Sequence, residues 1–157
     1  MANITAIAAG FGYAFDNPDL CEWARPIGID DFSGRKSDVL YRPLMFQPAT
    51  RFQYGVSMDW VGVVIERVTN ISLEEYFRKF ICEPLNVRDI SFSPGEEMKS
   101  RLACLRRRKS DGSLIVSDHL LRHSLVPADD LGFCMGGCGC FGTLKDYSSK
   151  VPPPLSR

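Results

Sequence analysis

The chain has 157 residues, of which 45% are hydrophobic and 11% aromatic, a composition that favours one folded domain and argues against disorder. Nineteen basic residues balance nineteen acidic ones, and a net charge of zero gives no general attraction to nucleic acid or to an anionic membrane. No apolar run approaches the roughly 20 residues that a membrane span needs. We therefore expect a single domain over residues 1–157 with no nucleic-acid and no membrane partner.

The N-terminal stretch 1–12 is apolar but has no basic residue before its apolar part, which argues against a secretory signal peptide. The six cysteines are then expected to be free thiols in a reducing compartment, and we expect a cytoplasmic protein.

The first third of the chain predicts short elements. Residues 19–25 suit a short helix that ends at Pro26, and residues 28–37 suit a surface loop of glycine, serine and charged residues. Residues 40–48 are apolar but contain two prolines, so they are expected to be extended.

Two helices are predicted in the middle. Met58, Val61, Ile65 and Val68 recur at three- and four-residue steps and predict the buried face of a helix that stops near Asn70. The next helix begins with a capping box from Ser72 to Glu75 and ends at Pro84. Its apolar face consists of Leu73, Tyr76, Phe77 and Phe80.

The last third predicts strands and a loop. Residues 87–92 suit a short strand, and residues 102–107 and 113–117 suit a hairpin around a turn at 111–112. A loop rich in glycine and cysteine follows over 133–142. Thr143 is placed to cap a final helix through Tyr147.

Four segments in this order resemble the serine β-lactamase-related family of esterases, transesterases and penicillin-binding proteins. They are Gly10–Phe15, Leu44–Ser57 with its tyrosine at 54, Glu74–Val87, which is similar to the family's EYF…IFEPLGM stretch, and Gly136–Thr143, which is similar to its GGGGLFGT loop. The likeness covers roughly residues 10–147 and is greatest to fungal enzymes that attach acyl groups to polyketides in secondary metabolism. It implies an α+β fold, namely the mostly helical middle of a β-lactamase or transpeptidase-like domain.

The resemblance also implies a chemistry. In this family the serine of an S-x-x-K motif attacks an ester or amide, and a lysine and a tyrosine relay its proton. Tyr54 matches the relay tyrosine, and Val56 stands where penicillin-recognising members have asparagine, which favours an esterase-like member. Trp60, Gly136 and Gly137 are then candidate substrate-binding residues. The implied substrate is a small-molecule acyl ester or an acyl carrier, with no cofactor.

The nucleophile motif of the family precedes the Gly10 loop, and a K-T-G or H-x-G strand follows the glycine-rich loop; neither occurs at these places in the 157 residues. We therefore expect an internal fragment with little or no activity. A non-catalytic binding remnant that partners a full-length relative, and a gene-model fragment of a longer product, are the alternatives. The apolar helix faces would lack their usual cover, so self-association is also expected.

Two serine motifs compete for the role of nucleophile. Ser33 and Lys36 match S-x-x-K literally, but the setting is glycine-containing and charged, and it lies after the Gly10 loop. Ser57 lies in a near-match to G-x-S-x-G in which Asp59 replaces the last glycine, and its hydroxyl is expected to satisfy free N–H groups at a helix start.

Other residues have simpler readings. Cys134, Cys138 and Cys140 form C-x3-C-x-C, but a fourth ligand is not evident, so we expect small-residue replacement and no metal. His119 and His123 are expected to be surface or loop residues, although either could complete a zinc site. Without the resemblance, Tyr54 would be read as a partly buried aromatic at a helix start, and Trp23 and Trp60 as core or loop anchors.

Overall fold

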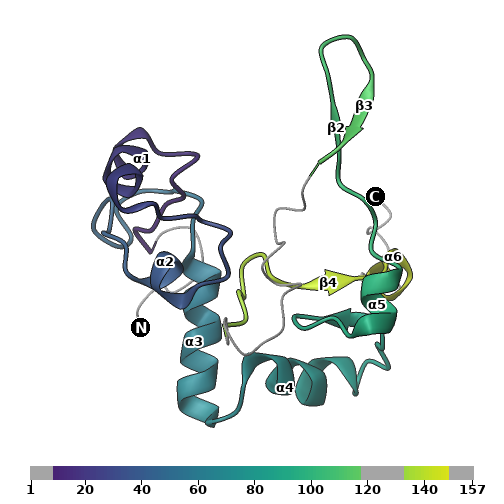
Figure 1. The fold of residues 1–157 in the computed structure, drawn as a ribbon. Coiled ribbons are helices and arrows are strands. Elements are labelled where there is room, and N and C mark those ends of the chain that lie inside the picture. Colours follow the sequence, from purple (N-terminus) through teal and green to yellow (C-terminus); the bar gives the residue numbers. More distant parts are fainter. Residues whose placement is uncertain (1–8, 118–132, 149–157) are drawn as a thin grey trace, which may run out of the picture.

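A computed structural model describes residues 9–117 and 133–148 of the chain (Figure 1). None of the helices in these ranges is long and apolar enough to cross a membrane. The described helices are α1 Pro18–Ala24, a 3-10 turn Arg25–Ile27, α2 Lys36–Leu40, α3 Ser57–Thr69, α4 Leu73–Phe77 with a π-helical continuation Arg78–Cys82, α5 Glu96–Ser100 and α6 Leu144–Ser148.

The described strands form two antiparallel pairs. β1 (Ile90–Ser91) pairs with β4 (Phe141–Gly142), so that Ile90 lies opposite Gly142. β2 (Arg106–Arg108) pairs with β3 (Leu114–Val116) in a hairpin that stands away from the rest of the chain (Figure 1). The architecture is α+β, and its helices dominate.

The predictions for the first third are partly right. α1 is confirmed, and the Asn17 side chain caps it by accepting a hydrogen bond from the Leu20 N–H at 3.1 Å. The prediction of a surface loop over 28–37 is wrong for Asp31 and Ser33, which are buried, and the loop passes directly into α2. Asp31 is buried with Arg42, a partner eleven residues further along the chain, as described below.

Helix α3 has the predicted position but a different buried face. It ends at Asn70, which takes the left-handed conformation with φ 58°, as the stop signal indicated. Its buried residues are Ser57, Asp59, Gly62 and Val63, whereas Val68 of the predicted face is 80% exposed and Met58 is 45% exposed. The prediction of the buried face is therefore wrong, because distant loops rather than periodicity decide which side is covered.

The second helix has half of the predicted capping box. The Ser72 hydroxyl accepts a hydrogen bond from the Glu75 N–H at 3.2 Å, as expected. At the same helix start, Glu66 of α3 accepts from the Leu73 N–H at 2.9 Å. The carboxylate of the preceding helix therefore supplies part of the cap and ties α3 to α4.

The predictions for the last third are partly right. The hairpin is confirmed, and the Thr143 hydroxyl caps α6 by accepting from the Asp146 N–H at 3.3 Å. The strand expected over 87–92 is present only as the two residues of β1. Helix α5 was not predicted.

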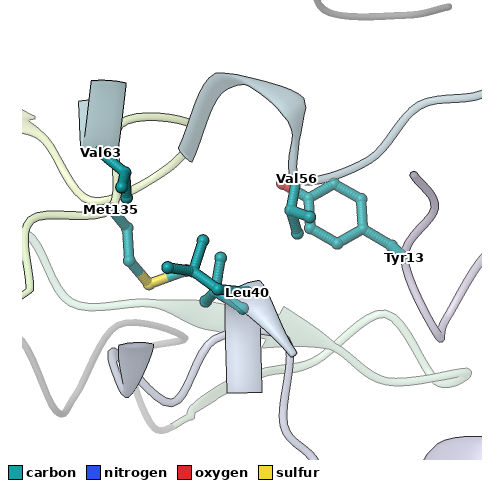
Figure 2. Packing of buried hydrophobic residues seen from close by; sticks show 6 residues of the cluster. Tyr13, Leu40, Val56, Val63 and Met135 are labelled. Carbon is teal, nitrogen blue, oxygen red and sulfur yellow. The ribbon is translucent and has the colours of Figure 1, made fainter. Parts of the chain in front are cut away.

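The core lies between the N-terminal loops, α2, α3 and the glycine-rich loop. Figure 2 shows how Met135 of that loop reaches toward Leu40 of α2, next to Val63 of α3. The cluster thus joins segments that are far apart in sequence, and it positions the loops described next. Its buried members are Tyr13, Val39, Leu40, Val56, Val63 and Met135.

Candidate functional site

Tyr54 lies in the loop just before α3. Its side chain is 56% exposed, so the ring is partly covered and partly open to solvent. One side of its ring contacts Tyr13, with 5.2 Å between the ring centroids. The contact joins two of the four segments that carry the family resemblance, the Gly10–Phe15 loop and the tyrosine segment.

Gly55 allows this contact. A Cβ atom on Gly55 would lie 2.5 Å from the Phe11 carbonyl oxygen and 2.8 Å from the Gly12 Cα atom, both of which are backbone atoms. Gly10, at the start of the same loop, has φ +90°, and a Cβ there would meet the Phe46 carbonyl oxygen. Glycines therefore let the Gly10–Phe15 loop and the tyrosine segment pass each other at close range, next to Tyr54 in the sequence.

Arg42 holds the Gly10–Phe15 loop from its other side. Its side chain is 1% exposed and donates to Asp31 Oδ1 at 2.7 Å and to the Gly12 carbonyl at 3.0 Å. Two further bonds go to the carbonyls of Val39 and Asp38. The other carboxylate oxygen of Asp31 accepts from the Ala14 N–H at 2.8 Å. Nearly all N–H donors of the Arg42 guanidinium are therefore satisfied, and the buried Arg42–Asp31 pair fixes the Gly10–Phe15 loop against α2.

The glycine-rich loop packs on the first turn of α3. The Gly137 N–H donates to Asp59 Oδ1 at 3.0 Å. A Cβ on Gly136 would lie 2.7 Å from the Met58 carbonyl oxygen, and a Cβ on Gly137 would lie 2.8 Å from Asp59 Oδ2. Both candidate glycines are thus needed for close approach, and the start of α3 is the place where three of the resembling segments meet.

Trp60 forms part of the same packing. Its ring stacks on Phe11 with 5.8 Å between centroids and an interplanar angle of 13°, at the edge of the core cluster. It thereby anchors the Gly10–Phe15 loop to α3. A further role in lining an acyl pocket stays a prediction.

Asp59 is a site residue that the sequence analysis missed as such. It is fully buried, and its Oδ2 has no hydrogen-bond partner within the described ranges. Burial is the main cause that raises the pKa of its carboxyl, and the Gly137 N–H acts in the opposite direction. The sequence alone does not indicate its burial, because the face that contains Asp59, Gly62 and Val63 becomes the buried one only through contacts made by the folded chain.

We expect Asp59 to make stability depend on pH in a direction opposite to ordinary acid denaturation. Because the pKa of Asp59 is higher in the folded protein than in the unfolded chain, the folded protein binds the proton more tightly. The stabilising effect is complete below the unfolded pKa of about 3.9 and is lost as pH rises to the folded pKa. Asp59→Asn keeps an acceptor for the Gly137 N–H but cannot titrate.

Urea unfolding of both proteins at several pH values tests this expectation. The free energy of unfolding of the wild type minus that of Asp59→Asn should increase as pH is lowered from neutral toward 4, because the other carboxyl groups cancel in the difference. A difference that is constant over this range, or that decreases on acidification, would contradict the raised pKa.

Neither alternative serine has the surroundings of a nucleophile. Ser33 is 5% exposed and lies in a turn, where its hydroxyl accepts from the Arg35 N–H at 3.0 Å, while Lys36 is exposed at the start of α2. Ser57 is 2% exposed, and its Oγ has no partner in the part of the chain that the structure describes. Ser57 lies at the start of α3 as expected, but the expectation that its hydroxyl satisfies free N–H groups there is wrong, and Val56 is the cap residue without a side-chain bond.

The cysteines of the glycine-rich loop favour the thiol form. Burial raises the pKa of Cys134 to about 11 and that of Cys138 to about 12, with the Asp59 charge as a further cause at Cys138. Zinc binds the thiolate, so metal binding would have to overcome both shifts. A metal-free loop stays a prediction, and His119 and His123 lie outside the described residues.

Comparisons with known proteins agree with this arrangement. The chain is 34% identical over 150 residues to ML-236A carboxylate methylbutanoyltransferase mlcH of Penicillium citrinum, and the aligned stretch covers 88% of this chain and 33% of that protein. It is 30% identical over 155 residues to acyltransferase mokF of Monascus pilosus, and the aligned stretch covers 95% of this chain and 36% of that protein. The chain thus spans about a third of the length of these relatives.

Among solved structures, a mutant of simvastatin synthase LovD from Aspergillus terreus superposes with a TM-score of 0.76 at 29% identity, over 93% of this chain and 33% of that chain. The hydrolase EstCE1 has the same fold at 21% identity, with a TM-score of 0.64 over 92% of this chain and 42% of that chain. The described α+β arrangement is therefore part of a β-lactamase or transpeptidase-like fold of the fungal acyltransferase type. The Beta-lactamase family matches residues 8–149, and the chain belongs to that family.

Proposed function

We propose that this chain supplies the tyrosine-bearing part of an acyl-transfer site that acts on small-molecule acyl esters or acyl carriers in secondary metabolism. The observation that carries the proposal is the meeting of three segments at the start of α3, where the exposed Tyr54 precedes Gly55 and the Gly137 N–H is bonded to Asp59. Relatives named as acyltransferases support the reaction class.

Tyr54 has the role of proton relay in this proposal. A phenol can pass a proton between an attacking hydroxyl and a leaving group when a neighbouring base shares it. The 157 residues hold no S-x-x-K before the Gly10 loop, and Ser33 and Ser57 are buried. We therefore propose that the isolated chain has little or no acyl-transfer activity.

The test compares the isolated chain with a graft. The isolated chain, incubated with a p-nitrophenyl ester, should show no stoichiometric acyl adduct by intact mass. A chimera in which residues 10–147 replace the aligned segment of mlcH should acylate, and Tyr54→Phe should slow acyl transfer by about 10²- to 10⁴-fold. Tyr41→Phe is the matched control, since Tyr41 is 78% exposed and lies outside the site.

Two outcomes would contradict the proposal. An adduct on Ser33 or Ser57 of the isolated chain would identify a different nucleophile. A chimera that acylates equally well with phenylalanine at position 54 would remove Tyr54 from the relay.

A non-catalytic binding remnant is the second candidate. It is favoured by the same packing, because the Gly10–Phe15 loop, the Tyr54 loop and the glycine-rich loop keep their mutual contacts while the candidate serines Ser33 and Ser57 are buried. Such a protein would bind an acyl ligand or a longer relative without reacting.

Self-association remains part of the proposal. Val68, Phe80 and Phe52 are 80%, 52% and 76% exposed, and exposed apolar side chains favour contact between copies. We also propose a cytoplasmic location, on the ground that the six cysteines are thiols.

A further inference from the structure

The β2–β3 hairpin has a charge that the proposed acyl site does not use. Arg106, Arg107, Arg108 and Lys109 are consecutive and exposed, and Asp111 at the tip is the one acid between residues 102 and 117. The whole chain has a net charge of zero, so the hairpin concentrates positive charge at one place. Within residues 9–117 and 133–148 none of these four cations has an ion-pair partner.

The pairing register shows which of these cations lie on the same face of the hairpin. Arg106 lies opposite Val116 and Arg108 opposite Leu114, so these four side chains share one face of the hairpin. Val116 is 68% exposed and Leu114 is 51% exposed. We call these four residues the hairpin face. It combines two guanidinium groups with two uncovered aliphatic side chains.

The hairpin is well formed although it stands apart from the body of the chain (Figure 1). Beyond the three paired residues of each strand, the Lys109 N–H donates to the Ser113 carbonyl and the Ser117 N–H donates to the Leu105 carbonyl, both at 2.9 Å. The Ser113 N–H donates to the Asp111 side chain at 2.8 Å and fixes the turn. The hairpin face therefore has a defined geometry before any partner arrives.

We propose that the hairpin face docks an acidic segment of another protein, which crosses this face in extended form. The side chains at every second position of the segment point to the hairpin face. Carboxylates among them pair with Arg106 and Arg108, and apolar side chains among them cover Val116 and Leu114. The guanidinium groups match carboxylates in charge and geometry. This inference does not depend on the acyl chemistry.

The composition of the hairpin favours a protein over the other anionic partners. Residues 104–117 contain no aromatic side chain on which a base could stack or that could enter a lipid interface. Asp111 places a negative charge at the tip, where it would meet a phosphate-rich surface. Leu114 and Val116 would gain nothing against phosphates but are covered by an apolar side chain of a protein segment.

Binding of a fluorescent peptide to the 157-residue chain tests the proposal. The probe has glutamate and valine in turn at every second position, with serine between them, so that both residue types point to one side, and its control has glutamine in place of glutamate. Arg106→Glu/Arg108→Glu should weaken binding of the acidic probe by at least about tenfold, because attraction becomes like-charge repulsion. Arg67→Glu/Arg88→Glu changes the net charge equally at exposed positions on the body and should leave binding within about twofold.

The hairpin face also predicts an apolar contribution, so Leu114→Ser should weaken binding while it leaves the charge unchanged. Equal binding of the glutamate and glutamine probes, or an equal loss in the body variant, would overturn the proposal. So would binding of single-stranded RNA or phosphatidylserine vesicles through Arg106 and Arg108 when the acidic peptide does not bind.

Discussion

Arg42→Met should lower the free energy of unfolding by about 3 to 5 kcal/mol, the range for removing one partner of a buried ion pair. The methionine has a similar length but leaves the Asp31 carboxylate, which is 5% exposed, without its cation. It also removes the donors to the carbonyls of Gly12 and Val39. The whole margin of a domain is about 5 to 15 kcal/mol, so the variant should be close to unfolding.

Urea unfolding followed by far-UV circular dichroism measures this change. Arg25→Met is the matched control, because the Arg25–Glu22 pair is 2.8 Å long but its side chains are 66% and 67% exposed. An exposed pair is worth less than about 1 kcal/mol. Adding Asp31→Asn to Arg42→Met should restore part of the loss, since the uncompensated charge is then gone. A loss in Arg42→Met no larger than in Arg25→Met would show that the pair does not hold the loop.

The sequence predicts α3 better than it predicts what α3 touches. The limits of the helix follow from local chemistry, since Asn70 accepts the left-handed conformation that ends it. Its buried face depends on the Gly10–Phe15 loop and the glycine-rich loop, which are distant in sequence. Periodicity therefore favoured Val68, whereas the structure buries Asp59 and Val63.

The candidate site divides in the same way. Tyr54, Gly136 and Gly137 are found through the family resemblance, because each belongs to a recognisable segment. Arg42 and Asp31 have no local signal, since one lies in an apolar, proline-containing stretch and the other in what reads as a solvated loop. Their pairing can be seen only in the folded structure. A charged residue is buried where the fold brings its partner to it, and the spacing of residues in the sequence does not show which residue that is.

Gly55→Ala should be the most damaging of the small substitutions at the candidate site. Its new methyl group would lie 2.5 Å from the Phe11 carbonyl oxygen and 2.7 Å from the Phe11 carbonyl carbon. Both are backbone atoms, so the contact is relieved only by moving the Gly10–Phe15 loop away from Tyr54. Overpacking of this kind costs about 1 to 3 kcal/mol, and here the shift would also strain the Gly12 carbonyl that Arg42 holds.

The position of Tyr54 links this stability change to the site. Moving the loop separates the Tyr54 ring from Tyr13 and unstacks Phe11 from Trp60, so Trp60 fluorescence, recorded with Trp23→Phe as background, should shift along with the urea midpoint. Gly95→Ala is the control: nothing lies within 4 Å of a Cβ there, and its φ of −70° suits any residue, so it should cost less than about 1 kcal/mol and leave the Trp60 signal unchanged. If Gly55→Ala behaved like Gly95→Ala, the two backbone segments would not be in contact. Tyr54 would then be placed by α3 alone, and the role assigned to the Gly10–Phe15 loop would be wrong.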